Sequence, residues 1–495
     1  MTPFLALVLL SIAPALSSVT ATFGSGAGSL SLGGGGIALP QDGGIVFTNP
    51  AGLVRLPGEN GVMLGYGLVR SEFSPFPEVW WDTNRDGRVD QEDAPLDIQP
   101  IYAQGDGLHM ALHRRIGRRF ALGAALFWPK DRILKLSTFE PELPTYFMYD
   151  SRLQRYGLAA GFGWEQIRGL SIGGGVHIVP RARYNITATI DATVVGAGEG
   201  QEEAEELVTD ITIDVHDMSL DLVADFAPMI SFHWMPGELI PPLSWLQLAG
   251  SWRGSTGLPV EVTGDLQINA SVEDIGNLDD IVLPVLLQVE LGVYDHYVPE
   301  QLTLGGAVTP WRWLSLYGET SWTRWSRMQI NVTEVVFAHI GSPLVEIDDD
   351  TIHEGNVTAF TWRDTWSFRA GGVLDLPRIE LTNPARYLQF RLRGGGGLEP
   401  TPLVSQSEYT AVLDASRLIL AGGLQAEHRD PFQLAEVVRW SAFGQLHVLG
   451  EGTLERRWLG VPTAGYPIEI DEDGMTSIPV GGHLWTAGLQ MELDY

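Results

Sequence analysis

The sequence contains no cysteine, which excludes disulfide bonds and thiolate metal sites. It is also short of basic residues, since 31 Lys and Arg stand against 61 Asp and Glu and give a formal net charge of −30 at pH 7. The phosphates of a nucleic acid would repel such a chain, so nucleic acid is not an expected partner.

Long apolar runs are also missing beyond the first residues. A membrane-spanning helix needs roughly 18 apolar residues, and the longest later candidate, 283–293, is interrupted by Gln288 and Glu290. Residues 4–16 form an apolar run of signal-peptide length, followed by a small-residue cleavage site that ends at Ala21. We therefore expect residues 1–21 to be a signal peptide and the protein to be exported. If it crosses a membrane, it must do so with strands.

The rest of the chain is rich in alternating segments. At the C-terminal end, Trp485, Leu489 and Leu493 belong to an apolar face that alternates strictly with polar residues and Gly488, which is the period of a strand with one apolar side. About fourteen runs read in this way: 60–72, 106–116, 119–130, 150–166, 170–194, 212–234, 244–264, 286–310, 313–336, 358–376, 387–398, 416–428, 434–449 and 483–495.

The connections between these runs alternate in length and charge. Gaps after even-numbered runs are short and often basic, as at 114–119, whereas gaps after odd-numbered runs are usually long and several are acidic, as at 196–210 and 346–355. This asymmetry is typical of an outer-membrane barrel with tight periplasmic turns and long external loops. The predicted fold is all-β: a transmembrane, antiparallel, up-and-down barrel of about 14 strands over residues 59–495.

The segment "GGGGIALPQDGGIVFTNPAGLVRLPG" (33–58) precedes the first strand. Asn49 can cap a helix by accepting a hydrogen bond from a backbone N–H two or three residues on, and Pro50 suits the first helical position. A short helix over 51–55 is expected, ended by Pro57-Gly58. On these residues alone, an ordinary capped helix explains the segment.

This Gly-rich segment with "NPAGL" resembles the FadL/TodX family of outer-membrane transporters for hydrophobic compounds. A second block resembles the family's C-terminal strands: "TWSFRAGGVLDLP", "LQFRLRGGGGLEPTPL" and "LDASRLILAGGL" (365–377, 388–403 and 413–424). The resemblance implies a non-enzymatic, hatch-gated channel in the bacterial outer membrane, with lateral release of its cargo. It also implies that residues 22–58 form an N-terminal hatch containing short helices, in which Asn49, Pro50 and Ala51 shape the gate.

Small residues and arginines are expected on opposite walls of the lumen. Gly65, Ala121 and Gly161 belong to faces that would leave room for a plug. Arginine offers a bidentate partner to a cargo carboxylate, which makes substrate-binding candidates of Arg369, Arg391 and Arg393. The alternative is that these arginines and Arg439 pair with inward acids and hold the lumen together; the acids would be Asp375, Glu427, Glu492 and Asp494.

The loop "DTNRDGRVDQED" has the spacing of a calcium loop. Gly87 takes the position of the sharp turn, and Ca²⁺ prefers six to eight oxygen ligands. The expected ligands are the side chains of Asp82, Asn84, Asp86, Asp90 and Asp93 and the carbonyl of Arg88. An acidic turn without metal is the alternative.

Three functions remain open at this stage. We find no H-E-x-x-H and no phosphate-binding loop, so an enzyme is not expected. The first hypothesis is a monomeric channel for long-chain fatty acids or other hydrophobic compounds, in contact with membrane lipid and lipopolysaccharide. The second is a barrel that acts mainly in surface binding or adhesion through calcium-ordered acidic loops. The third is a secreted soluble β-rich binding protein or enzyme.

Overall fold

The computed structural model describes residues 25–495 except for 75–78, 82–93, 97–104, 131–145, 147–148, 150–155, 196–207, 257–259, 274–280, 294–296, 329–333, 341–360, 382–385, 406–412, 430–434 and 458–474. The predicted signal peptide and the predicted calcium loop therefore lie outside the described residues.

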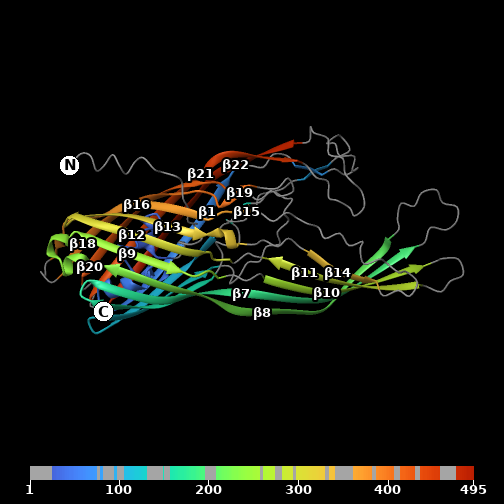
Figure 1. Cartoon of the computed structure of the whole chain (residues 1–495), viewed down its shortest axis with the longest axis horizontal. Helices are drawn as coiled ribbons and strands as arrows, with labels where there is room; N and C mark the ends of the chain where they lie inside the picture. Colours follow the sequence, from blue (N-terminus) through green and yellow to red (C-terminus); the bar gives the residue numbers. More distant parts are fainter. Residues whose placement is uncertain are drawn as a thin grey trace.

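Fourteen antiparallel strands form a closed barrel (Figure 1). Each pairs with the next barrel strand along the chain, and the last pairs with the first from Gly61↔Asp494 to Phe73↔Gly482. The prediction of about fourteen up-and-down strands is confirmed. The strands are β1 (Asn60–Phe73), β4 (Gly105–Ile116), β5 (Phe120–Pro129), β6 (Gly157–Ile167), β7 (Leu170–Val195), β8 (Val208–Trp234), β9 (Leu246–Arg253), β12 (Glu300–Trp311), β13 (Leu314–Arg324), β16 (Thr365–Asp375), β18 (Tyr387–Glu399), β20 (Arg417–Arg429), β21 (Val437–Arg457) and β22 (Met475–Asp494).

Several strands differ in extent from the prediction. The expected run 286–310 is two strands, β11 (Ile281–Val293) and β12, and the expected run 244–264 ends in the barrel at Arg253. β10 (Val260–Glu273) then pairs with β11 and, in parallel, with the part of β7 that extends beyond the barrel (Figure 1). Alternation identifies a strand but not its partner, so these extra pairings could not be read from the pattern.

Smaller elements complete the sheets. They are β14 (Glu334–Ile340) beside β11, β17 (Ile379–Glu380) beside β18, and the short pairs β2 (Val79–Trp81) with β3 (Ala94–Leu96) and β15 (Thr361–Trp362) with β19 (Leu403–Ser405). Three-residue 3₁₀ turns lie at η5 (Pro236–Glu238), η6 (Pro241–Leu243) and η7 (Trp325–Arg327).

The barrel has two unlike ends. Tight turns such as 117–119 and 168–169, together with the C-terminus, lie at one end, which we call the short-turn end (Figure 1). The long connections, such as 254–299, lie at the other end, which we call the mouth. The alternation of connection lengths that the sequence predicts is confirmed.

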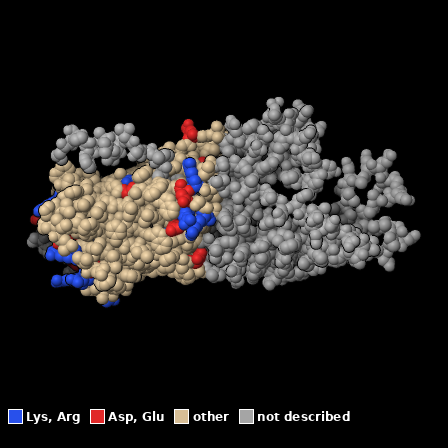
Figure 2. Space-filling view, in the orientation of Figure 1, with Lys and Arg blue, Asp and Glu red and all other residues tan. Residues whose placement is uncertain are grey.

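The outer surface of the barrel is apolar. Leu489 is 68% exposed and Ile230 64% exposed. Figure 2 shows a broad surface largely free of charged side chains between two charged zones. Exposed tryptophans lie near both ends of the strands: Trp164, Trp245, Trp311, Trp313 and Trp440 toward the short turns, and Trp128, Trp366 and Trp485 toward the mouth. An apolar band between aromatic girdles is the surface that a barrel presents to a lipid bilayer.

Residues 25–58 fill the lumen and are called the hatch from here on. They contain the helix α2 (Ala27–Leu30) and the 3₁₀ segments η1 (Gly43–Phe47) and η2 (Pro50–Arg55). Leu32, Val46 and Leu53 of the hatch are almost completely buried. Within the described residues, none of the helices has the length and hydropathy needed to cross a bilayer.

Candidate functional site

The backbone of the hatch is held by polar side chains of the barrel wall. A buried segment with little regular structure leaves N–H and C=O groups that need partners. Gln490 accepts from the N–H of Ala27 (2.7 Å), and Gln445 donates to the carbonyl of Leu30 (2.6 Å). His233 contacts the carbonyl of Ala38 (3.1 Å) in the same way. Side chains of the wall therefore position the hatch through hydrogen bonds to the hatch backbone. A hydrophobic pattern in the sequence cannot reveal such contacts.

The predicted gate residues lie at the start of η2. Ala51 donates its N–H to Ser231 (3.0 Å) and accepts from Ser171 through its carbonyl (2.9 Å). The prediction that Asn49 caps the helix is wrong, because its side chain makes no capping hydrogen bond. Instead its amide donates to the carbonyls of Ile37 (3.1 Å) and Phe232 (3.4 Å), so it ties two parts of the hatch and β8 together. The helix itself is 3₁₀ rather than α.

Pro50 and Ala51 rest on a wall of glycines from β6 and β7. A Cβ atom on Gly161 would lie 3.1 Å from Pro50, and one on Gly173 would lie 2.3 Å from the backbone nitrogen of Ala51. Real Cβ atoms essentially never come as close as 2.3 Å, and 3.1 Å is unusually tight, so larger side chains here would push the hatch away. The expectation that small inward residues make room for a plug is confirmed.

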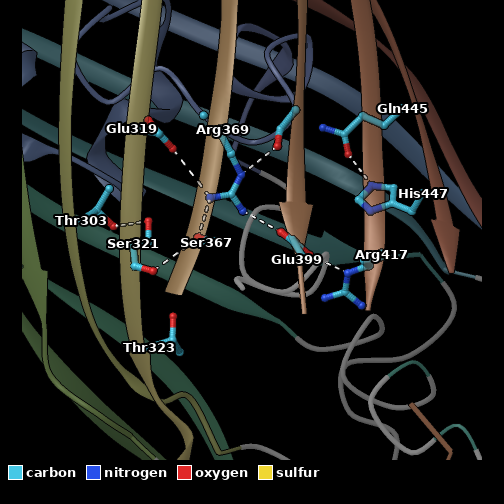
Figure 3. Close-up of polar contacts among 12 residues, drawn as sticks. Thr303, Glu319, Ser321, Thr323, Ser367, Arg369, Glu399, Arg417, Gln445 and His447 are labelled. Atoms are coloured by element: carbon cyan, nitrogen blue, oxygen red, sulfur yellow. Dashed lines mark hydrogen bonds and ion pairs between the residues drawn. The ribbon is translucent and has the colours of Figure 1, made fainter. Parts of the chain in front are cut away.

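On the opposite wall, the ion pair of Glu319 and Arg369 forms hydrogen bonds with the backbone of the hatch (Figure 3). Glu319 of β13 accepts from the N–H groups of Gly36 (2.8 Å) and Ile37 (3.0 Å). Arg369 of β16 donates to the carbonyl of Gly33 (3.0 Å) and lies 3.7 Å from Glu319. Both side chains are almost completely buried. We call Glu319 and Arg369 the latch.

The latch continues toward the mouth as a chain of charges (Figure 3). Glu399 bridges Arg369 (2.7 Å) and Arg417 (2.5 Å). Arg417 donates to the hydroxyl of Tyr149, which donates to Asp414 (3.0 Å). Burial raises the pKa of the Tyr149 hydroxyl well above its usual value, so the hydroxyl keeps the proton that it donates. The hatch is thus connected through polar contacts to residues at the mouth.

The arginines predicted to bind substrate lie inside the barrel as expected, but two of the three are already paired. Arg369 belongs to the latch, and Arg391 lies 2.5 Å from Asp375. Arg393 instead donates to Gln41 of the hatch (3.0 Å) and to Gln425 (2.9 Å), and its Nη1 atom has no hydrogen-bond partner among the described residues.

Arg439 forms a second cluster of charges near the short-turn end. It pairs with Glu427 (3.3 Å), Glu492 (3.0 Å) and Asp494. The alternative prediction, that inward arginines pair with the named acids, therefore agrees with the structure for Arg391 and Arg439. Arg369 is also paired, but with Glu319 and Glu399, which the prediction did not name.

Aromatic side chains close the mouth of the barrel. Phe73 stacks on Tyr146 with ring centroids 4.0 Å apart, and Trp325 stacks on Trp362 at 6.3 Å. These rings, with Tyr149, Tyr297 and seven aliphatic residues, form one buried cluster to which the hatch contributes no residue. We call it the aromatic mouth. Most of its members lie outside the barrel strands, so no periodic pattern could have grouped them.

A small polar cavity lies beside the hatch, on the wall formed by β8, β9, β12, β13 and β16. Its volume is about 50 Å³, and Arg253, Ser251 and Ser321 line it together with the latch. A cavity of roughly 150 Å³ is needed to hold a molecule the size of benzene. This cavity is therefore too small for such a molecule while the hatch stays in place.

Solved structures share this architecture. A FadL homologue from Pseudomonas aeruginosa superposes with a TM-score of 0.51 at 14% sequence identity, over 97% of this chain and 100% of that one. This chain has the same fold. The toluene transporters TodX from P. putida and TbuX from Ralstonia pickettii give TM-scores of 0.48 and 0.45, at 13% and 14% identity, over 95% of this chain and 98% of each of theirs. No family model and no curated protein matches the chain.

Proposed function

We propose that this protein is a non-enzymatic channel of the bacterial outer membrane that takes up hydrophobic compounds, and that the hatch is its gate. The fold, with its apolar band and two aromatic girdles, supports a place in the bilayer. The aromatic mouth is the observation that indicates a hydrophobic cargo. A channel for hydrophilic solutes needs a water-filled lumen, whereas here the lumen is filled by the hatch and covered by aromatic rings.

Cargo would first dissolve into the aromatic mouth. Transfer of apolar surface out of water is favourable by about 25 cal/mol per Å², and aromatic faces add stacking with an aromatic cargo. The cargo would then lie above a closed hatch, since the cavity beside the hatch is too small for it. Passage therefore requires the latch and the contacts of Asn49 and Ala51 to loosen.

The charges of the lumen favour an uncharged cargo near the mouth. Arg369 and Arg417 share Glu399, and Arg369 also faces Glu319, so neither guanidinium reaches the cargo without its carboxylate partners. Arg393 stays a candidate partner for an anionic group further along the path. Fatty acids and neutral hydrocarbons are thereby distinguishable: Arg393→Gln should slow the uptake of hexadecanoate and leave the uptake of toluene unchanged.

Uptake into proteoliposomes tests the proposal. The full chain should admit labelled toluene and exclude a sugar of similar size. Trp325→Ala with Trp362→Ala should reduce toluene uptake at least several-fold, because it removes the stacked pair of the mouth. Trp366→Ala is the matched control, since Trp366 lies close by in the chain and is 49% exposed on the lipid face. Equal uptake of toluene and sugar, or equal loss in the control, would contradict the proposal.

We also propose that residues 82–93 bind Ca²⁺. β2 and β3 pair antiparallel with Trp81 opposite Ala94, which supports the proposal because the two residues that flank the twelve-residue loop lie side by side. A closed loop of this spacing can bring its oxygens around one ion. The ion would order an external loop and could bridge to lipopolysaccharide. Adhesion through such loops is the alternative function, and it predicts wild-type levels of surface binding in a variant that has lost uptake.

A further inference from the structure

The lipid-facing surface of the barrel is hollowed over β4, β5, β6 and β7. The hollow is a groove of about 710 Å³. The register of the four strands explains it. Ala124 and Ala160 face each other across β5 and β6 and form the floor. On either side run rows of large residues, with Leu122 opposite Phe162 in one row and Leu126 opposite Leu158 in the next.

The ridge nearer the short turns is exposed and apolar. Leu122 is 44% exposed and Phe162 41% exposed, and the Phe162 ring leans over Gly174, where a Cβ atom would lie 2.9 Å from it. The groove is therefore apolar, with a floor of small side chains beside a ridge of large ones, which suits a hydrocarbon chain.

A basic turn adjoins the same groove. Arg114 lies opposite Leu122 in the register and lines the groove itself. It begins the sequence RRIGRR, in which Arg115, Arg118 and Arg119 follow within five residues at the short-turn end. Arg114, Arg118 and Arg119 are exposed, and none of the four is ion-paired within the part of the chain that the structure describes.

We propose that this groove and turn bind one anionic phospholipid of the periplasmic leaflet, with an acyl chain in the groove and the phosphate at Arg114 and the turn. Guanidinium groups match phosphate oxygens in geometry and charge. Charge complementarity decides in favour of an anionic lipid over a zwitterionic one, because three exposed cations, Arg114, Arg118 and Arg119, lie there without a carboxylate partner among the described residues. The inference depends on the proposed membrane location but not on transport.

Native mass spectrometry of the full chain, released from detergent in the presence of palmitoyl-oleoyl lipids, tests this inference. The protein should retain phosphatidylglycerol in preference to phosphatidylethanolamine. Arg114→Gln with Arg118→Gln should lower retention of phosphatidylglycerol by on the order of tenfold. Ala160→Leu, which fills the floor, should lower retention of both lipids.

Two variants serve as matched controls. Arg312→Gln removes an exposed cation from another short turn, and Ala442→Leu enlarges a small exposed residue on β21. Both should retain phosphatidylglycerol as the wild type does, and all variants should show the heat-modifiable gel migration of a closed barrel. Equal retention of the two lipids, or unchanged retention in the turn and floor variants, would overturn the inference. Because retention is measured without uptake, a failure of the transport proposal would leave this result unaffected.

Discussion

Replacing Glu319 by alanine should release the hatch. The carboxylate accepts hydrogen bonds from two buried N–H groups of the hatch and faces Arg369 at 3.7 Å. Each buried donor left without a partner costs about 1–3 kcal/mol, so the closed position should lose about 2–6 kcal/mol. Since 1.4 kcal/mol corresponds to a factor of ten, the open population should rise at least about 30-fold.

Ion conductance across a planar bilayer measures this release. The wild-type protein should show rare openings, and Glu319→Ala should show frequent ones. Ser321→Ala is the control, because Ser321 faces the same cavity two residues further along β13 and hydrogen bonds to Thr303 of the wall (2.8 Å). A Glu319→Ala protein that migrates as a folded barrel and yet leaks no more than the control would refute the assignment of the latch.

Three further changes have expected outcomes. Gly173→Ala should destabilise the docked hatch by about 1–3 kcal/mol through overpacking, and the hatch should then be proteolysed faster. Gly306→Ala is the control and should have no such effect, because the nearest atom to its Cβ would lie 3.4 Å away. Arg439→Met should lower the gel-shift temperature of the barrel, because three carboxylates lose their cation at a cost of about 3–5 kcal/mol; Arg429→Met removes an exposed pair and should have little effect. Asp86→Ala should abolish calcium uptake in calorimetry of the purified protein, and unchanged uptake would exclude the proposed ligand set.

The barrel could be predicted from the sequence because its physical cause is local. Period-2 alternation, with long and short connections in turn, indicates most barrel strands, their order and their lipid-facing side. Two predicted runs, 244–264 and 286–310, nevertheless each join a barrel strand to a strand outside the barrel. The parallel pairing of β10 with β7 could not be foreseen, since nothing in either strand specifies its partner.

The site was only partly predictable. Gly161 was recognisable because a plug needs room, the gate segment only through its resemblance to the FadL/TodX family, and Arg369 because an inward arginine can pair with a carboxylate. Glu319 was missed, since its role depends on two backbone N–H groups almost 300 residues away in the chain. Asn49 was assigned the wrong hydrogen bond for the same reason, because its partners are set by tertiary contacts rather than by the following turn.

Locking the hatch to the wall tests the central claim most directly. The chain has no cysteine, so a single engineered pair is unambiguous. A Cβ atom on Gly43 would lie 3.0 Å from that of Ala111 on β4, near the 3.5–4.5 Å typical of a disulfide. Toluene uptake by the Gly43→Cys, Ala111→Cys protein in proteoliposomes should stop on oxidation and return on reduction, while each single variant stays active. Undiminished uptake by the fully oxidised, cross-linked protein would contradict gating by the hatch.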